Sequence, residues 1–358
     1  MSEDNEHPSG SEVTPTAPGV EPAAPENPAV HEALAGPGPE APARDYAGGE
    51  QSARLGPWAS RYLGPFLVAG AAALWATDAL FRLPVLQTLS PATVVLAEHT
   101  LALAVLLPWA ILRRHTLLDM TFKEWLSALI TGAGGSAIAT VLFTASFKYV
   151  NPSVAILLQK LQPILTVSLA FFFLGDRPKS AFFMWAPMAL LSGLVVSFPD
   201  LDFRFLFDEV GSDARSRGVA YALGAAALWA AATVAGKVLL SRISSFRATF
   251  WRFWFGWATL LAIQLVGRIE TPWHAFEDAA LLKSLAYMAL GPGLGAVSLY
   301  YLGLKRTHAS TATFVELIFP VTAVVLNSVF LNLPLLPVQV LAGSLLLLSV
   351  TQISLKGH

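Results

Sequence analysis

Cysteine is absent from the 358 residues, and charged residues are scarce at 13%. Without cysteine there is no disulfide, no thiolate metal site and no cysteine nucleophile. A soluble domain usually carries about a quarter charged residues. A chain so poor in charge and 54% hydrophobic therefore indicates a lipid bilayer as its solvent. The net charge of −1 argues against nucleic acid as a partner.

Sequence motifs of ATP hydrolysis and of common hydrolases are also missing. The chain has no G-x-x-x-x-G-K-[ST], no H-E-x-x-H and no G-x-S-x-G. Of the seven histidines, only His99 falls well inside an apolar segment, so a histidine metal cluster is not supported. The sequence predicts a protein that is not an enzyme and that needs no cofactor and no metal.

Residues 1–57 differ in composition from the rest of the chain. They are rich in proline, alanine, glycine and glutamate, and they contain few large apolar side chains. Such a segment buries too little apolar surface to offset its ordering entropy, so we expect a disordered tail. The tail lacks the basic start and apolar middle of a signal peptide. It is interpreted either as a regulatory, partner-binding tail or as a solvated extension.

One heptamer, GAAALWA, occurs twice, at Gly70–Ala76 and at Gly224–Ala230, an offset of 154 residues. A second pair of segments, beginning at Phe143 and Tyr300, ends on a lysine in both cases and is offset by 157 residues. Matching punctuation with a small drift indicates an internal duplication. The predicted copies are residues 62–199 and 217–358, joined by an extracytoplasmic loop at 200–216.

Apolar segments long enough to cross a bilayer follow one another from residue 62 onward. A membrane-spanning helix needs about 20 residues, and on this measure each copy contains five helices, the sixth of the ten starting at Val219. We therefore predict an all-α membrane protein of ten transmembrane helices. Because five is odd, the second copy starts on the opposite side of the membrane, so the two repeats are inverted.

Lysine and arginine near the helix ends predict the orientation. They are more numerous in the loops on the side of the tail than in those on the opposite side, and cytoplasmic loops carry the excess. We expect both termini in the cytoplasm and a multi-pass protein of the plasma or inner membrane.

Ionisable residues within the predicted helices are the best candidates for function, because each is costly to insert into lipid. Asp78, Lys160 and Glu316 are interpreted as substrate contacts, although Asp78 has an alternative partner in Arg82, one helical turn away. Lys160 and Glu316 have the alternative of a structural ion pair. Glu98 and His99 are candidates for proton or ion coupling. These two neighbours are about 100° apart on a helix, so only one faces straight into a cavity.

Polar and aromatic residues extend the candidate substrate site. Gln159 and Gln162 lie on the same polar helix as Lys160. Such polar stripes either line a substrate path or join helices by hydrogen bonds. The repeat tryptophans, Trp75 and Trp229, are interpreted as stacking platforms or as interfacial residues.

Two prolines, Pro163 and Pro320, interrupt corresponding helices 157 residues apart. Each removes a backbone hydrogen bond in the middle of a helix. Interrupted helices at matched places in two halves are typical of a transporter's binding region, so both prolines are candidate hinges. A tolerated kink is the alternative interpretation.

With these motifs in place, the chain resembles the EamA-type family of the drug/metabolite transporter superfamily. The resemblance rests on the two Leu-Trp-Ala openings, on Leu174-Gly-Asp-Arg-Pro178, and on the segments Asn151–Pro163 and Ala309–Pro320. The second copy departs from the pattern at Leu331-Asn-Leu-Pro334, which lacks the Gly-acid pair. Glu98 stands where the family often has arginine, whereas Arg252 keeps it.

The resemblance implies secondary transport of small metabolites, such as amino acids or related solutes, most often outward. It implies a central cavity built around the fourth and ninth helices, which agrees with the choice of Gln159, Lys160, Gln162 and Glu316. The expected partners are a small-molecule substrate and the bilayer. A non-transporting receptor or scaffold that acts through its tail is the rival function. The oligomeric state does not follow from the sequence.

Overall fold

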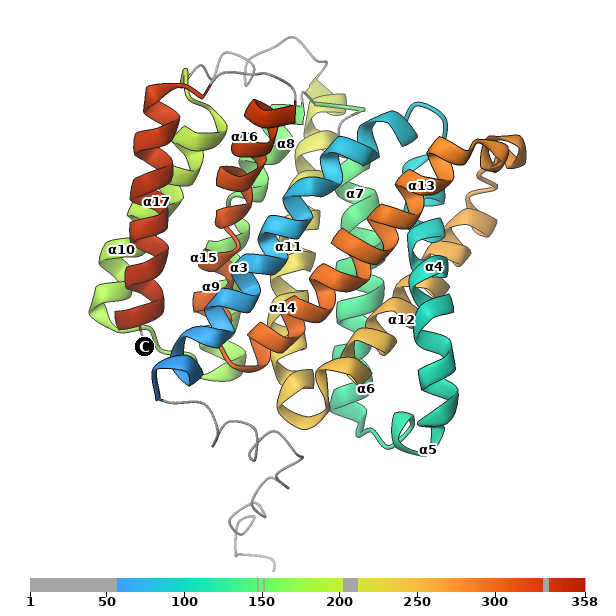
Figure 1. Cartoon of the computed structure of the whole chain (residues 1–358), viewed down its shortest axis with the longest axis horizontal. Coiled ribbons are helices and arrows are strands. Elements are labelled where there is room, and N and C mark those ends of the chain that lie inside the picture. Colours follow the sequence, from blue (N-terminus) through green and yellow to red (C-terminus); the bar gives the residue numbers. More distant parts are fainter. Residues whose placement is uncertain (1–56, 147, 151, 202–211, 331–334, 358) are drawn as a thin grey trace, which may run out of the picture. The chain divides into compact units, whose positions relative to one another are not determined.

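A computed structural model describes residues 57–357, with gaps at 147, 151, 202–211 and 331–334 (Figure 1). The tail predicted to be disordered lies outside these residues except for Pro57. All described residues belong to one unit, 45–358. Within the described ranges every regular element is helical and no strand occurs, which confirms the all-α prediction.

The helices follow the chain in the order labelled in Figure 1. The first half contains α3 (Pro57–Val85), α4 (Pro91–Leu112), α5 (Arg114–Leu117), α6 (Phe122–Leu129), the π-helical η1 (Ile130–Ile138), α7 (Ala139–Ser146), α8 (Pro152–Gln159), α9 (Gln162–Leu174) and α10 (Ser180–Ser197). The second half contains α11 (Ser212–Arg242), α12 (Ser245–Val266), the 3₁₀ turn η3 (Trp273–Glu277), α13 (Ala279–Met288), the π-helical η4 (Ala289–Gly295), α14 (Ala296–Lys305), α15 (Ala309–Val315), α16 (Ile318–Phe330) and α17 (Pro337–Lys356).

Nine helical segments in the described part of the chain are long and apolar enough to cross a membrane. They do not include α12, which is as long as α4, at 22 residues, but carries Arg247 and Arg252. The structure thus supports a multi-pass membrane protein, while the tenth crossing stays a prediction.

The helix α11 is longer than the sequence indicated. It begins at Ser212, so residues 212–216 of the predicted loop are helical. This first turn contains the charged residues Asp213 and Arg215, which continue the helix beyond its apolar part. Hydropathy detects only the apolar part of a helix, and the earlier start was therefore missed.

Two helices are interrupted near the prolines that the sequence singled out. The break between α8 and α9 falls at residues 160–161, and the break between α15 and α16 falls at residues 316–317. A proline ring clashes with the carbonyl four residues before it and offers no N–H to that carbonyl. For Pro163 and Pro320 that carbonyl belongs to Gln159 and Glu316, so each break forms where the clash requires it.

Close backbone contacts determine how the helices run relative to one another. A Cβ on Gly303 of α14 would lie 2.7 Å from the Gly64 carbonyl oxygen near the start of α3. The Lys237 ammonium, near the end of α11, donates to the carbonyl oxygens of Leu304 and Thr307, both at 2.8 Å. Therefore α3 begins on the side where α11 and α14 end, and α3 and α11 run in opposite directions (Figure 1). We call this side, on which α17 also ends, the terminal side.

A corresponding contact occurs on the opposite side. A Cβ on Gly218, near the start of α11, would lie 2.7 Å from a methyl carbon of Val150 and 2.9 Å from the Cβ of Tyr149. Gly64 and Gly218 are offset by 154 residues, as the repeated heptamers are. Only glycine at each position lets the neighbouring chain approach this closely.

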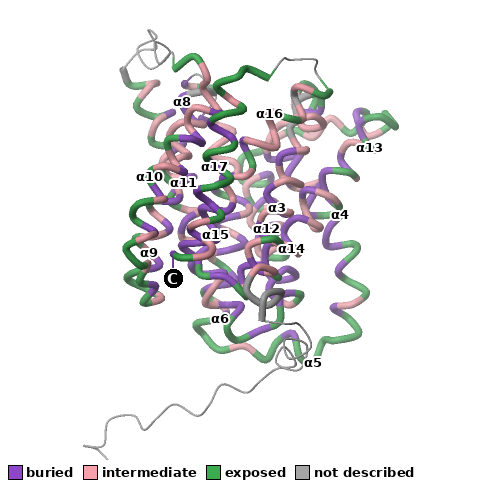
Figure 2. Tube along the Cα trace, turned by 60° about the vertical axis from the view of Figure 1, so that its left-hand side comes forward, coloured by how far each residue is buried: buried purple, intermediate pink, exposed green. Residues whose placement is uncertain are grey.

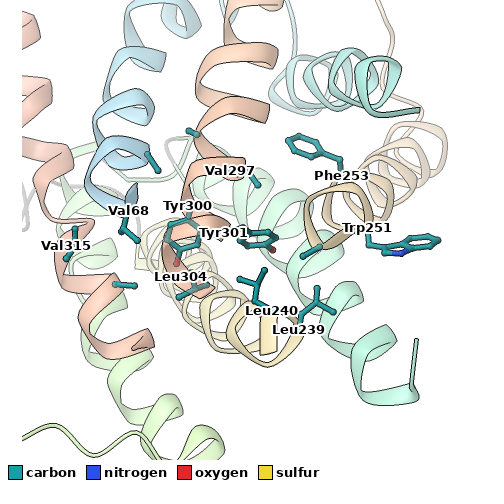
Figure 3. Close-up of a cluster of buried hydrophobic side chains, with 14 of the residues drawn as sticks. Val68, Leu239, Leu240, Trp251, Phe253, Val297, Tyr300, Tyr301, Leu304 and Val315 are labelled. Carbon is teal, nitrogen blue, oxygen red and sulfur yellow. The ribbon is translucent and has the colours of Figure 1, made fainter. Parts of the chain in front are cut away.

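Buried residues concentrate in the middle of the bundle, whereas outer helices expose large apolar side chains (Figure 2). Phe172 on α9 is 77% exposed, Phe183 on α10 is 62% exposed and Leu341 on α17 is 72% exposed. Exposed apolar surface of this extent requires an apolar surrounding, which a bilayer supplies. The inner core includes Leu239, Leu240, Tyr300, Tyr301 and Leu304 (Figure 3).

Candidate functional site

Polar and aromatic side chains from four separate parts of the bundle meet at the breaks. The Gln162 side-chain amide donates to Glu316 Oε2 at 3.5 Å, and the Tyr300 phenol also faces the Glu316 carboxylate. The Tyr300 hydroxyl lies 3.2 Å from Thr233 Oγ1, and its ring packs against Trp75 with centroids 5.3 Å apart. We call these five residues the central cluster.

The fold explains why these residues meet. Gln162 begins α9 and Glu316 lies in the facing break, so neither is shielded by a continuous helix at that point. Tyr300 comes from α14, and Trp75 comes from α3, which packs against α14. Figure 3 shows Tyr300 and Tyr301 side by side on α14. The cluster thus joins residues from both predicted copies.

Two buried acceptors near the cluster lack a hydrogen-bond partner among the described residues. They are Glu316 Oε1 and Thr313 Oγ1. A buried polar atom left without a partner costs roughly 1–3 kcal/mol. The arrangement is therefore suited to a ligand that brings hydrogen-bond donors to this place.

Both repeat tryptophans contact an aromatic residue of the other predicted copy. The Trp229 ring lies 5.2 Å from that of Phe143, as Trp75 lies 5.3 Å from Tyr300. In addition, the Trp229 indole N–H donates to the Gly135 carbonyl oxygen in η1 at 3.0 Å. The two pairs are equivalent, because Phe143 and Tyr300 are offset by 157 residues.

Arg252 provides a positive charge next to the central cluster. Its Nε donates to Ser136 Oγ at 2.8 Å, and its Nη1 donates to the Tyr301 hydroxyl at 3.3 Å. Its charge also acts on Glu316. Arg252 occupies the position that Glu98 holds 154 residues earlier.

Lys160 and Gln159 lie at the break that follows α8, and both are half-buried. The Lys160 ammonium makes no ion pair or hydrogen bond with any residue that the structure describes, so it does not form the alternative ion pair with Glu316. A cation without a counter-ion inside a spanning segment is expensive unless water or an anion reaches it. Lys160 is thus available for an anionic group.

Asp78, Arg82 and Glu98 form a second group, which we call the Arg82 cluster. The Arg82 guanidinium pairs with both oxygens of Asp78 through Nε and Nη2, and its Nη2 also donates to Glu98 Oε1 at 2.8 Å. Asp78 was predicted as a substrate contact, but it takes its alternative partner instead. The cluster holds two carboxylates and one cation.

His99 does not share the partners of its neighbour Glu98. His99 Nδ1 lies 2.9 Å from the Val95 carbonyl oxygen, and the ring packs on Phe253 with centroids 5.0 Å apart. A Cβ on Gly256 would lie 2.7 Å from His99 Nε2, which has no partner among the described residues. Glu98 faces α3 and His99 faces α12, as the spacing of 100° predicts. The two side chains form no direct relay.

Several residues of the site were not predicted from the sequence. Tyr300 was detectable, because the repeat aligns it with Phe143 and thus with the partner of a repeat tryptophan. Thr233 and Ser136 carried no distinguishing signal, since an isolated hydroxyl in a helix usually bonds its own backbone. No group of acidic or histidine side chains in the described ranges could hold a metal ion.

Comparison with known proteins agrees with this geometry. The pattern of the EamA-like transporter family matches the chain twice, at residues 62–198 and 216–355. The riboflavin transporter ImpX of Fusobacterium nucleatum is 32% identical over 302 residues, which are 81% of this chain and 97% of ImpX. YhbE of Escherichia coli, an uncharacterized inner membrane transporter, is 29% identical over 187 residues, 51% of this chain and 56% of YhbE.

A solved crystal structure has the same fold, with a TM-score of 0.67 at 20% identity over 82% of this chain and 96% of that one. Fold, site and relatives together define a multi-pass helical membrane transporter of small molecules rather than an enzyme. The chain belongs to the EamA-like transporter family.

Proposed function

We propose that the chain is a secondary transporter that carries a small organic solute by alternating access around the central cluster. The observation that carries the proposal is the meeting of Gln162, Tyr300 and Glu316 at two helix breaks. Broken helices at matched places in two halves favour a substrate site there. No nucleotide-binding motif accompanies them, so a solute or ion gradient supplies the energy.

The proposed architecture is ten crossings in two inverted repeats, 62–199 and 217–358. The opposite directions of α3 and α11 and the double match to one family pattern support this arrangement. The π-helical segments η1 and η4 lie in corresponding helices, and such segments are frequent at functional sites. The halves rock about these segments and about the breaks near Pro163 and Pro320.

We propose a planar heteroaromatic substrate with hydrogen-bond donors, such as riboflavin or a related compound. The aromatic pairs around Trp75 and Trp229 suit a flat ring, and the unpartnered Glu316 Oε1 accepts a ring N–H. ImpX is a transporter of riboflavin, which supports the same class. Lys160 sets the charge preference by receiving an anionic substituent. Amino acids, the class implied by the resemblance, are the competing substrates.

Ligand-induced thermal stabilisation of the purified protein tests this proposal. A ligand that binds only the folded state raises the melting temperature, by an amount equivalent to about 2.7 kcal/mol at 100 times its Kd. We expect a shift with riboflavin and none with amino acids at equal concentration. A shift with amino acids alone would contradict the heteroaromatic class.

Variants connect that shift to the site. We expect Glu316→Gln and Trp75→Ala to abolish the flavin-induced shift, and Lys160→Met to reduce it most for phosphorylated flavins. Trp273→Ala and Lys148→Met are matched controls, because both side chains are exposed in loops. Normal binding and flux by folded Lys160→Met and Glu316→Gln proteins would refute the site.

Flux into proteoliposomes distinguishes transport from a scaffold role. Deletion of residues 1–57 leaves flux unchanged in a transporter, whereas a scaffold that acts through its tail loses its partner. Substrate loaded inside or outside reads the direction, which the family resemblance implies is outward.

The Arg82 cluster supports a role in coupling. Its two carboxylates share one guanidinium, so a proton taken up by Glu98 leaves Arg82 paired with Asp78 alone. His99 lies on the next helical position but contacts a different helix. Flux driven by a pH gradient and lost in Glu98→Gln would support proton coupling, and unchanged flux would assign the cluster a structural role.

A further inference from the structure

A buried acidic residue follows α9 on the terminal side. Asp176 is 6% exposed, and its Oδ2 accepts hydrogen bonds from the Ser310 backbone N–H at 3.2 Å and from Ser310 Oγ at 2.8 Å. His308 Nδ1 lies 3.2 Å from the other oxygen, Oδ1. Ser310 belongs to the first turn of α15, where backbone N–H groups have no helical partner. Asp176 therefore caps a helix that is distant in sequence.

The end of α9 positions this carboxylate. Gly175 adopts a left-handed conformation, with φ of 64°, which few other residues tolerate, and it terminates the helix. The Asp176 backbone N–H then returns to the Ala170 carbonyl oxygen at 3.2 Å. The side chain is thereby held against the start of α15.

The contact joins the two helices that carry the breaks. Gln162 lies at the other end of α9, and α15 leads directly to Glu316. A second polar contact lies on the same side, where Lys237 of α11 donates to three carbonyl oxygens at the end of α14. The charges of Asp176 and Lys237 act on each other, so the two contacts belong to one network.

The sequence provides this network on one side only. At the offset of 157 residues, Ser310 corresponds to Ser153, but Asp176 corresponds to Leu333. At the offset of 154, Lys237 corresponds to Leu83. The donor hydroxyl is thus present in both copies, whereas the carboxylate and the ammonium occur once. These correspondences rest on sequence, since residue 333 lies outside the described part.

We infer that Asp176 is a one-sided latch that holds the terminal side closed by tying α9 to α15. The inference rests on the proposed alternating access and adds which of its two states is favoured. Releasing the latch opens the terminal side and, because the halves rock as units, closes the opposite side.

Cysteine labelling measures both sides, since the natural chain has no cysteine. Thr307 and Val150 are equivalent positions, 157 residues apart, and they are 5% and 6% exposed. Single Thr307→Cys and Val150→Cys reporters are placed in the full-length protein in lipid nanodiscs, where both sides meet solvent. The rate of reaction with a charged maleimide reports the opening of each side.

We expect Asp176→Ala to raise the Thr307→Cys rate about tenfold or more, since hydrogen bonds to a charged group contribute equilibrium factors of that size. The Val150→Cys rate falls in the same variant. Ser310→Ala, which removes one of the donors, gives a smaller change in the same directions. Asp278→Ala is the matched control: Asp278 caps its own helix, α13, through Ala280 N–H at 2.8 Å, so its loss leaves both rates unchanged.

Unchanged rates in folded Asp176→Ala and Ser310→Ala proteins would overturn the latch. A rise at both reporters would also overturn it, because that pattern indicates general loosening rather than a switch of sides. If Asp176→Ala does not fold, Ser310→Ala decides alone. Labelling needs no substrate, so a protein that binds no flavin but still switches sides contradicts the proposed substrate and leaves the latch intact.

Discussion

Arg82 neutralises two carboxylates at once, which makes it the most heavily used cation among the described ion pairs. Its guanidinium binds Asp78 on its own helix and Glu98 on α4. Breaking a buried pair by removing one partner is strongly destabilising, because the remaining charge stays in a poorly solvated place. Here the loss of one side chain would leave two such charges.

We predict that Arg82→Gln lowers the free energy of unfolding by up to about 3 kcal/mol, the lower end for buried pairs because the cluster is partly exposed. Thermal unfolding in detergent measures the change. The triple variant with Asp78→Asn and Glu98→Gln removes the unpaired charges, and we expect it to recover most of the loss. A triple variant less stable than the single one would contradict this explanation.

At the scale of residues, the sequence identified the candidates better than their partners. Glu98 and Glu316 stood out because ionisable groups inside spanning segments are rare and costly. Their partners depend on which helices pack together, and an inventory of charges leaves several pairings open. Asp78 illustrates this, since a partner one turn away in its own helix competes with any substrate.

The interrupted helices show what the sequence contains at the scale of elements. Both breaks were predicted from Pro163 and Pro320, because the physical cause is local to the proline and the carbonyl four residues before it. The π-helical segments were not predicted. Their glycines indicated close packing, but an extra residue in a turn is stabilised by neighbouring helices rather than by local preference.

Glycine in η1 is required by packing at one position and not at another. A Cβ on Gly132 would lie 2.6 Å from the Arg252 carbonyl oxygen, whereas one on Gly134 would meet only a Leu228 methyl at 3.6 Å. We predict that Gly132→Ala costs about 1–3 kcal/mol by overpacking against α12. Gly134→Ala, in the same segment, is expected to be neutral. Thermal unfolding of both variants tests this, and equal stabilities would refute the packing argument.

At the scale of the whole molecule, the duplication was the most informative feature of the sequence. It predicted corresponding breaks, corresponding aromatic pairs and corresponding glycine contacts, and the structure contains all three. It did not predict where the copies differ in function, because the Asp176 contact depends on a segment from the other half. The start of α11 was also missed, since charge at a helix end does not register as hydropathy.

Orientation is the remaining property of the whole molecule that we predict. Asp119 and Glu270 are exposed on opposite sides, Asp119 next to Arg247 at the start of α12. With both termini in the cytoplasm, an impermeant maleimide added to intact cells labels Glu270→Cys and not Asp119→Cys. The reverse pattern would place the terminal side outside. Permeabilised cells, in which both cysteines react, provide the control.

Glu98 and Arg252 occupy equivalent places in the two halves and carry opposite charges. Two identical five-helix chains paired around a twofold axis would have to place the same residue at both positions. A single chain that contains both halves is free of that restriction, so fusion permits an acid to face a base across the axis. The protein thereby gains a built-in electrical polarity, and its inward and outward half-cycles need not have equal rates.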